Sequence, residues 1–263
     1  MACRRRRLRL AGLLPRGSGD PLARRPPRIA LVTPTCRGGI IAAGEGSRLR
    51  ATGFSMPKPL VPVAGVALID GVIGNFRGAG ITSLVIIVNE QARACRDWVH
   101  SRFPDLDIEV IVKTTPSSLE SFREVTRRLG GDRALISTVD TWCRADDFAA
   151  FVHAALRRPA DASVLAVTPL VADERPLWVD VGHDGRVGRI GGSAGTHVTA
   201  GMYMLSERAR AAVPPPLGSL REFLAWLLAQ GEPFYAETIA DVVDVDQKSD
   251  VVLAEALVRG GDR

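Results

Sequence analysis

Residues 39–60 have the sequence GIIAAGEGSRLRATGFSMPKPL, and this stretch decides the fold. Its first part, Ile40 to Ala43, is a short apolar run next to glycines, which is typical of a strand buried on both faces of a parallel sheet. Gly44 and Gly46 follow where the chain leaves the sheet, and without side chains there successive backbone N–H groups can converge on an anion. The stretch therefore predicts a buried strand followed by a phosphate-binding loop.

Two basic side chains accompany the glycine loop. Arg48 offers a planar fork suited to bidentate phosphate contact, and Lys58 offers a compact charge held between two prolines. The loop is neither the Walker lysine loop nor the dinucleotide fingerprint, because Leu49 stands where the third glycine would be and no Gly-Lys-Ser/Thr follows. We interpret it as a different way of holding a triphosphate; the alternative is an ordinary turn with two solvated cations.

The stretch resembles the nucleotidyltransferase superfamily that includes the sugar-1-phosphate nucleotidylyltransferases, or NDP-sugar pyrophosphorylases. There an apolar strand is followed by G-x-G-x-R-L and P-K-P-L, and this chain has GEGSRL at 44–49 and PKPL at 57–60. The resemblance covers most of residues 38–258. It implies an NTP substrate, a phosphorylated acceptor, Mg²⁺ as cofactor, catalytic roles for Arg48 and Lys58, and nucleotide contacts from Ala42, Ala43, Gly44, Glu45, Gly46, Ser47 and Arg48.

Strand and helix patterns alternate after residue 38. Apolar runs predict strands at 39–43, 83–88, 108–113 and 134–138, and helical patterns lie between them at 67–78, 90–102 and 117–129. This alternation predicts an α/β fold with a doubly wound, mostly parallel sheet, and the resemblance implies the Rossmann-like nucleotidyltransferase version of it. We expect one domain over 38–260, with a small β-hairpin insertion formed by 178–180 and 186–190.

Ligands of such sheets bind at the carboxyl ends of the strands, where Asp140 follows the apolar run 134–137. Carboxylates are ligands that Mg²⁺ prefers, so Asp140 is the first predicted metal ligand and a catalytic residue. The stretch 241–246 resembles a late family element, D-V-D-T-P-E-D-L, which implies Asp246 as the second ligand, with Asp244 as the alternative on the same strand face. The competing explanation is that these acids cap turns, as Asp250 is expected to do.

The acceptor side is predicted from a different strand. Residues 198–206 are similar to the family's N-x-G-I-Y-V-L-S, which implies acceptor contacts from Thr199 and Gly201 together with Lys58. Many sugar enzymes have a Glu-Lys pair where this chain has glycines at 191–192, so the lysine that grips the sugar phosphate is missing. Arg189 and Lys113 are the candidates to replace it.

The segment expected to contact the base also departs from the sugar enzymes. Residues 117–121, SSLES, resemble more closely the segments of cytidylyltransferases that act on choline phosphate and similar alcohols. Ser118 is predicted to reach the nucleotide, and capping of the following helix by Ser117 is an equally good interpretation. The sequence therefore does not identify the base of the nucleotide.

The net charge of +5 belongs to the beginning of the chain. Residues 1–37 contain ten Arg and one acid, a charge of 10 − 1 = +9, which leaves 24 basic and 28 acidic residues, or −4, from 38 onward. We expect residues 1–37 to be a disordered Arg- and Pro-rich arm, and we expect no nucleic-acid partner. Four scattered cysteines and the lack of a long apolar run favour a reducing cytoplasm without a membrane span.

Our hypothesis is a Mg²⁺-dependent nucleotidyltransferase that couples an NTP to a phosphorylated acceptor, preferably a sugar 1-phosphate, and releases pyrophosphate. The first alternative keeps the chemistry and changes the acceptor to a phosphorylated alcohol, such as choline or a polyol, or to a molybdenum cofactor. The second is a nucleotide-binding regulatory protein with a decayed site, which the missing lysine suggests. A homo-oligomer is also compatible with the sequence.

Overall fold

The computed structural model describes residues 36–172 and 174–261. The predicted arm, residues 1–37, lies outside this range except for its last two residues. Of these, Arg37 is fixed to the domain, because its guanidinium donates hydrogen bonds to Ser83 Oγ at 3.0 Å and to the carbonyl of Arg128 at 2.8 Å. The ordered domain therefore includes the residue before the predicted boundary.

The central sheet has the strand order β10-β9-β11-β6-β1-β4-β5, and β8 pairs with both β11 and β12. The four strands predicted from the apolar runs are present and parallel, and they begin and end within one residue of expectation. Their bounds are β1 (Gly38–Ala42), β4 (Ser83–Val88), β5 (Asp107–Val112) and β6 (Arg133–Thr138).

The second half of the sheet is largely antiparallel. Its central strand is the long β11 (His197–Ser206), which pairs with β6, β8 and β9. The other strands are β8 (Ser163–Thr168), β9 (Trp178–Val181), β10 (Val187–Ile190) and β12 (Phe234–Thr238). Antiparallel pairing of β9 with β10 confirms the predicted hairpin. The register of β11 against β8 shifts between Thr199 and Tyr203, around Gly201.

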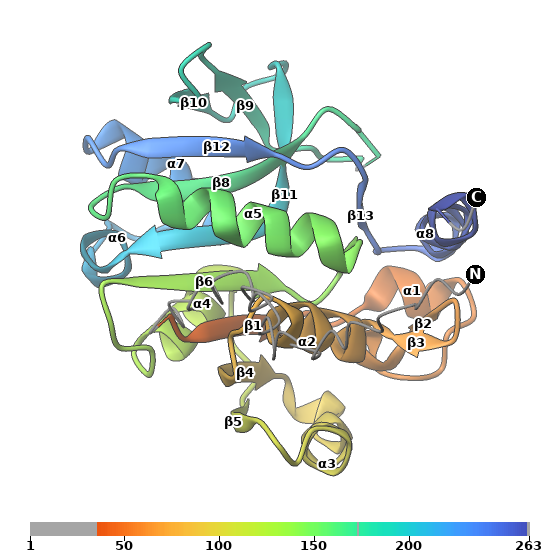
Figure 1. The fold of residues 1–263 in the computed structure, drawn as a ribbon. Coiled ribbons are helices and arrows are strands. Elements are labelled where there is room, and N and C mark those ends of the chain that lie inside the picture. Colours follow the sequence, from red (N-terminus) through yellow and green to blue (C-terminus); the bar gives the residue numbers. More distant parts are fainter. Residues whose placement is uncertain (1–35, 173, 262–263) are drawn as a thin grey trace, which may run out of the picture. The chain divides into compact units, whose positions relative to one another are not determined.

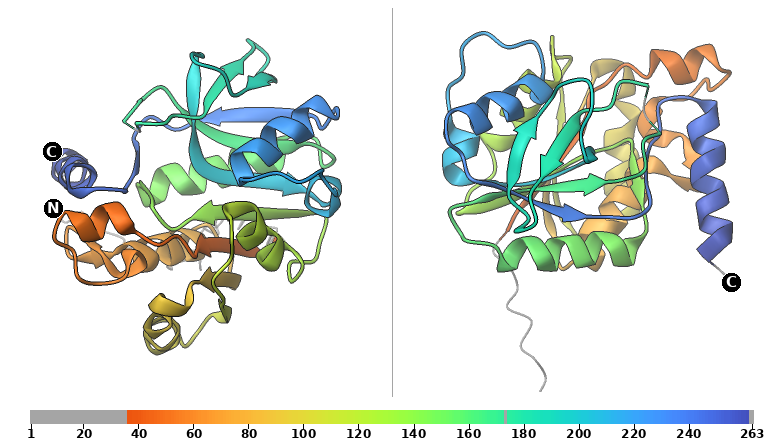
Figure 2. Two further views of the ribbon diagram at one scale, coloured as in Figure 1. Left: turned by 180° about the vertical axis from the view of Figure 1, so that it is seen from behind. Right: turned by 90° about the horizontal axis from the view of Figure 1, so that it is seen from above.

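Helices cover both faces of the sheet (Figures 1 and 2). On one face lie α2 (Leu68–Gly78), α3 (Ala94–Arg102) and α5 (Ala145–Arg157), whose apolar residues share a core cluster with the sheet. On the other lie α4 (Ser118–Thr126), α6 (Glu207–Ala211) and α7 (Leu220–Ala229). The doubly wound fold is thereby confirmed. The helix predicted at 90–102 is divided into the 3-10 turn η2 (Glu90–Ala92) and α3, and the one predicted at 117–129 ends at Thr126.

A third apolar cluster joins the beginning of the domain to its end. It contains Leu49, Val61, Val63 and Leu68 from the segment after the glycine loop, and Val243, Val245, Val251 and Ala254 from the late segment. Its residues come from α1 (Ser47–Ala51), β2 (Pro62–Val63), α2, β13 (Val242–Asp244), α8 (Lys248–Gly261) and the segments next to them, and Trp142 of β7 (Thr141–Cys143) packs against it. The short elements η1 (Lys58–Leu60) and β3 (Val66–Ala67) lie in the same early segment. The small β7–β13 ribbon was not predicted.

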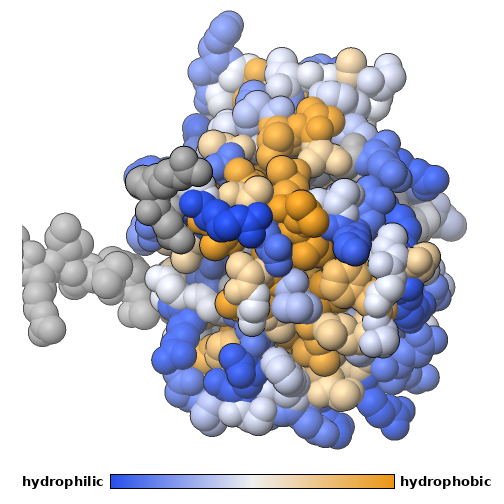
Figure 3. All heavy atoms as spheres, turned by 90° about the vertical axis from the view of Figure 1, so that its right-hand side faces the viewer, coloured by the Kyte–Doolittle hydropathy of each residue, from blue (hydrophilic) through white to orange (hydrophobic). Residues whose placement is uncertain are grey.

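The surface on the side of α8 carries a band of apolar side chains (Figure 3). Val252 of α8 is 54% exposed and Val66 of β3 is 52% exposed. None of the helices in the described part of the chain has the length and apolar character needed to cross a membrane.

Candidate active site

The site lies at the carboxyl ends of β1 and β6, where the glycine loop and the turn after β6 come together. A cavity of about 370 Å³ opens there. Ala43, Gly44 and Glu45 line it from the loop, Asp140 from the turn, and Lys58 from η1. Because β1 and β6 are adjacent and parallel, both chain segments leave the sheet at the same edge.

Lys58 is the centre of this arrangement. Its Nζ lies 2.6 Å from Asp140 Oδ2 and 2.5 Å from Asp246 Oδ1, so that one ammonium group bridges both carboxylates. The lysine is 8% exposed. The structure thus brings together three of the residues predicted from three distant parts of the sequence.

Backbone hydrogen bonds fix the two carboxylates beside each other. The N–H of Val245 donates to the carbonyl of Asp140 at 2.9 Å, and Val243 and Val245 are fully buried in the third apolar cluster. Asp250 Oδ2 accepts from the N–H groups of both Asp246 and Gln247 at 2.9 Å. Asp250 therefore caps the start of α8, as expected, and at the same time holds the backbone of Asp246.

The charges of the bridge stabilise one another. Burial of Lys58 favours the neutral amine, yet the two carboxylates raise the pKa of Lys58 above its ordinary value. Burial of Asp140 favours the neutral acid, but the charge and hydrogen bond of Lys58 lower the pKa of Asp140 below its ordinary value. Both groups are therefore ionised at neutral pH.

Arg48 extends this ionic network outward. Its guanidinium donates to Asp246 Oδ2 at 2.6 Å and lies 4.0 Å from a carboxylate oxygen of Glu174, and half of its side chain is exposed. Gly46 precedes α1 with a φ of 63°, and a Cβ on it would lie 2.7 Å from Lys58 Cβ. Lys58 can approach the loop this closely because residue 46 is glycine.

The donor set fits Mg²⁺. Asp140 and Asp246 direct an oxygen each at the same cationic centre, and Mg²⁺ typically takes one or two carboxylates together with phosphate oxygens and water. In the described part of the chain no group of three or more His, Cys, Asp or Glu side chains is arranged to hold a metal. Asp244 ends β13 and lines a different cavity, beside Thr199.

The nucleotide side of the cavity is formed by the segment before α4. Ser117 caps α4, because its hydroxyl accepts from the N–H of Glu120 at 3.2 Å. Ser118 also lines the cavity, but its hydroxyl accepts from the N–H of Leu220 at 3.0 Å, a contact between α4 and the start of α7. Ser118 is thus placed where a nucleotide could reach it and also connects two helices.

The remaining predicted nucleotide residues lie around the loop. Ala42 ends β1 with its side chain in the core, Gly46 packs against Lys58, and Ser47 and Arg48 begin α1. None of these four is among the residues that line the 370 Å³ cavity.

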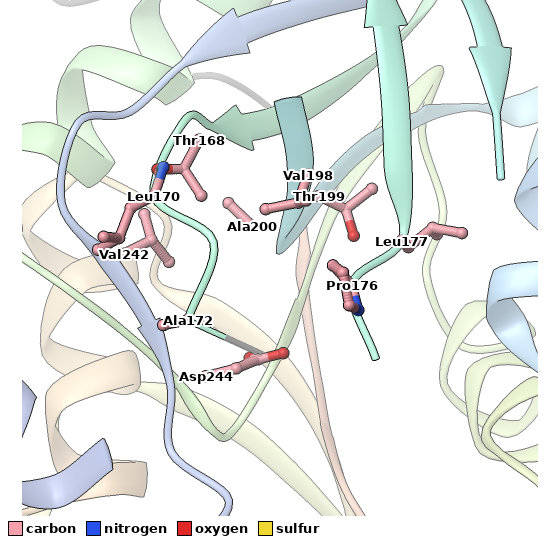
Figure 4. A pocket seen from close by; sticks show the side chains of 10 residues that line it. All are labelled: Thr168, Leu170, Ala172, Pro176, Leu177, Val198, Thr199, Ala200, Val242 and Asp244. Carbon is pink, nitrogen blue, oxygen red and sulfur yellow. The ribbon is translucent and has the colours of Figure 1, made fainter. Parts of the chain in front are cut away.

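Two of the predicted acceptor residues, Thr199 and Gly201, lie on β11, and Figure 4 shows Thr199. Gly201 has a φ of 66°, and a Cβ there would collide with the hydroxyl oxygens of Thr138 and Thr141 beside the Asp140 turn. Thr199 lines a small cavity of about 20 Å³ with Thr168, Leu170, Ala172, Pro176, Leu177, Val198, Ala200, Val242 and Asp244. Figure 4 shows these residues where β8, β11 and β13 approach one another, and most of them are apolar.

Both candidates for the missing lysine are held in ion pairs. Arg189 Nε lies 2.8 Å from Asp180 Oδ2, and its other nitrogens donate to the carbonyls of Gly191 and Ala194. Lys113 Nζ lies 2.9 Å from Glu124 Oε1. Neither residue lines the cavity that Lys58 and Asp140 share.

Asn89 was missed by the sequence analysis. It follows β4, is 5% exposed, and donates from Nδ2 to the carbonyls of Ala43 at 3.3 Å and Gly44 at 3.1 Å. The available signal was a polar residue directly after a buried strand that ends at the same sheet edge as β1.

Comparison with known proteins gives a family match. A family model described as "MobA-like NTP transferase domain" matches residues 38–183, more than half of the chain. A CMP-5'-(3-aminopropyl)phosphonate synthase from Streptomyces rubellomurinus is 28% identical over 214 residues, which are 77% of this chain and 32% of that protein. A protein named bifunctional IPC transferase and DIPP synthase, from Rubrobacter xylanophilus, is 28% identical over 84% of this chain and 51% of its own length.

These two relatives are longer than the chain, which spans about a third of one and half of the other. Among solved structures, the inositol-1-phosphate CTP transferase from T. maritima matches with a TM-score of 0.73 and 17% identity, over 86% of this chain and 98% of that one. At 17% identity this match shows a similar fold and nothing further.

Proposed function

Because this chain belongs to the MobA-like NTP transferase domain family, we propose that it transfers the nucleotidyl group of an NTP to a small phosphorylated acceptor and releases pyrophosphate. Membership confirms the superfamily predicted from the sequence, and the named activities of the relatives support the predicted class of enzyme. The observation that carries the proposal is the bridge from Lys58 to Asp140 and Asp246, at the cavity lined by the glycine loop.

In the proposed reaction an acceptor phosphate oxygen attacks the α-phosphorus of the NTP. A new P–O bond forms while the bond from the α-phosphorus to the bridging oxygen of the leaving pyrophosphate breaks. No general base is required, since the acceptor phosphate is already ionised. The protein contributes by holding the two reactants in line and by neutralising the charge that develops between them.

The residues of the bridge have separate tasks in this proposal. Backbone N–H groups of the loop and Arg48 hold the β and γ phosphates, and Lys58 neutralises charge at the α-phosphate and the acceptor. Asp140 and Asp246 would hold Mg²⁺, with Asp244 as the alternative second ligand. Bound there, Mg²⁺ supplies Lewis-acid stabilisation of the phosphate oxygens.

Two acceptor classes have support. The CMP-phosphonate product named for the Streptomyces relative supports an alkyl phosphonate as the acceptor. A serine-leucine pair at 118–119 supports CTP as the donor. The motifs GEGSRL and PKPL support a sugar 1-phosphate, the acceptor preferred from the sequence.

A substrate panel tests the proposal. We would measure pyrophosphate release from each NTP with 3-aminopropylphosphonate, phosphocholine, a polyol phosphate and glucose 1-phosphate, with Mg²⁺ and with EDTA. We expect release with CTP and an alkyl acceptor, and none with EDTA. Asp140→Asn should be inactive, whereas Asp146→Asn, a change on the exposed face of α5, should be fully active. Thermal stabilisation by NTPs with no release from any pair would instead identify a nucleotide-binding regulatory protein.

A further inference from the structure

Asn89 holds the peptide groups of the glycine loop by their carbonyl ends. Its Nδ2 donates to two successive carbonyls, those of Ala43 and Gly44, while its Oδ1 accepts from the N–H of Ala92 at 2.8 Å. The side chain is buried and is fixed at both of its polar atoms. Asn89 is therefore a rigid support on one side of the loop.

The orientation of the carbonyls determines where the loop's N–H groups point. In a trans peptide the N–H is antiparallel to the C=O of the same planar unit. The carbonyl of Ala43 shares its unit with the N–H of Gly44, and the carbonyl of Gly44 shares its unit with the N–H of Glu45. Since both carbonyls face Asn89, both N–H groups face away from it.

These two N–H groups have no other task in the described part of the chain. Neither donates a hydrogen bond to any described residue, although Ala43, Gly44 and Glu45 all line the cavity that contains Lys58 and Asp140. A Cβ on Gly44 would meet no atom of the described residues within 4 Å, so the side of the backbone to which it would project is open. Two successive donors beside an ammonium group form a concave site for an anion.

We propose that Asn89 is the positioning residue of the phosphate loop, because it turns the N–H groups of Gly44 and Glu45 toward the phosphates of the bound nucleotide. This inference rests on the proposed function in so far as the ligand is a nucleoside triphosphate. Asn89 does not line the cavity that Lys58 and Asp140 share, so in this proposal it acts through the loop and not on the ligand itself. It acts by fixing the direction of two donors before binding, so that the loop need not be ordered by the ligand.

The variant Asn89→Ser distinguishes a role of Asn89 in positioning the loop from a role in the stability of the fold alone. A serine can still cap η2 by accepting from the N–H of Ala92, but its short side chain cannot reach the carbonyls of Ala43 and Gly44. The substitution also adds no charge near the phosphates. A matched control is Asn75→Ser, since Asn75 is a second buried asparagine, in α2, and its Nδ2 contacts Cys143 Sγ rather than the loop.

The experiment measures binding by calorimetry, with CTP, inorganic tripolyphosphate and cytidine as the probes. For Asn89→Ser we expect affinity for CTP and tripolyphosphate to fall about tenfold, the size of losing one or two oriented hydrogen bonds, with cytidine affinity unchanged. Asn75→Ser should bind all three probes as the wild type does. In turnover, Asn89→Ser should raise the KM for NTP more than it lowers kcat.

Two results would overturn the inference. One is wild-type affinity of Asn89→Ser for tripolyphosphate, and the other is an equal loss for cytidine and CTP. If the variant does not fold, amide NMR of the wild type decides: tripolyphosphate should shift the Gly44 and Glu45 N–H resonances, and unshifted resonances would refute the proposal. If the wild-type protein binds CTP and tripolyphosphate but releases no pyrophosphate from any substrate pair, the proposed function is refuted and the inference about Asn89 is not.

Discussion

Lys58 Nζ lies 2.6 Å from Asp140 Oδ2, although the two residues are 82 positions apart in the chain. With Asp246 on its other side, the ammonium group stands at the point where both carboxylates converge. A buried cation between two anions holds them together against their mutual repulsion. We therefore expect substitutions of these three residues to affect the site strongly.

Removing the charge of Asp140 should stop the reaction without unfolding the protein. We expect Asp140→Asn to reduce pyrophosphate release by two orders of magnitude or more, about 3 kcal/mol of transition-state stabilisation. Thermal unfolding monitored alongside should show a folded variant. Retention of wild-type turnover would refute the role of Asp140.

Replacing Lys58 by methionine should weaken the folded state in a pH-dependent way. The pKa of Asp140 is lowered by folding, so its contribution to stability is present above its ordinary value of 3.8 and is lost as pH falls through the lower folded value. The pKa of Lys58 is raised by folding, so its contribution is present below 10.5 and is lost as pH rises through the higher folded value.

The loss of unfolding free energy in Lys58→Met should therefore be largest between these two limits and should shrink in strong acid. Urea titrations of both proteins at pH 7 and pH 2.5 check this. An identical loss at both pH values would contradict the ionic bridge. Adding Mg²⁺ at pH 7 should restore part of the lost stability, because the cation would replace the ammonium group between the carboxylates.

Gly46→Ala should destabilise the protein, whereas Gly44→Ala should not. At position 46 the φ of 63° is unfavourable for alanine, and the new Cβ would lie 2.7 Å from Lys58 Cβ. We expect a loss of about 2 kcal/mol or more in unfolding free energy. At Gly44 no atom lies within 4 Å of the added methyl group, so denaturant unfolding should be nearly unchanged. Equal effects at both positions would refute this distinction.

Asp250→Ala should affect both stability and activity. The change leaves the N–H groups of Asp246 and Gln247 without their acceptor and should cost about 1–2 kcal/mol. Because the backbone of Asp246 is then less firmly held, pyrophosphate release should also fall. Asp241→Ala, a change of a half-buried acid just before β13, is the control and should change neither quantity. If Asp250→Ala keeps wild-type activity, Asp250 only caps α8 and does not position Asp246 for the reaction.

The parallel half of the fold could be predicted because its strands are continuous apolar runs separated by helical patterns. The strand at 198–206 was predicted from the resemblance and is found as β11. Its antiparallel pairing with β6 and the β7–β13 ribbon were not predicted, because they depend on contacts between distant segments. Asp140 and Asp246 were predicted as separate ligands, and the hydrogen bond from Val245 to Asp140 that brings them together is a backbone contact without a sequence signal.

The sequence also did not indicate which groups the side chains of the site contact. Lys58 was expected to face phosphates, and nothing in PKPL indicates that its ammonium group bridges two carboxylates. Ser118 was expected at the nucleotide, and its bond to Leu220 depends on how α7 packs against α4. Asn89 was missed because its partners are backbone carbonyls, which every sequence contains.

The third apolar cluster has a consequence for synthesis on the ribosome. It seats α8 and the segment of Asp246 against residues near the beginning of the domain, including Leu49 and Val61. A nascent chain that already contains the glycine loop, Lys58 and Asp140 still lacks one arm of the ionic bridge until residue 246 has emerged. Under the proposed function, we expect nucleotidyl transfer to be absent from incomplete chains and to appear when the last helix docks.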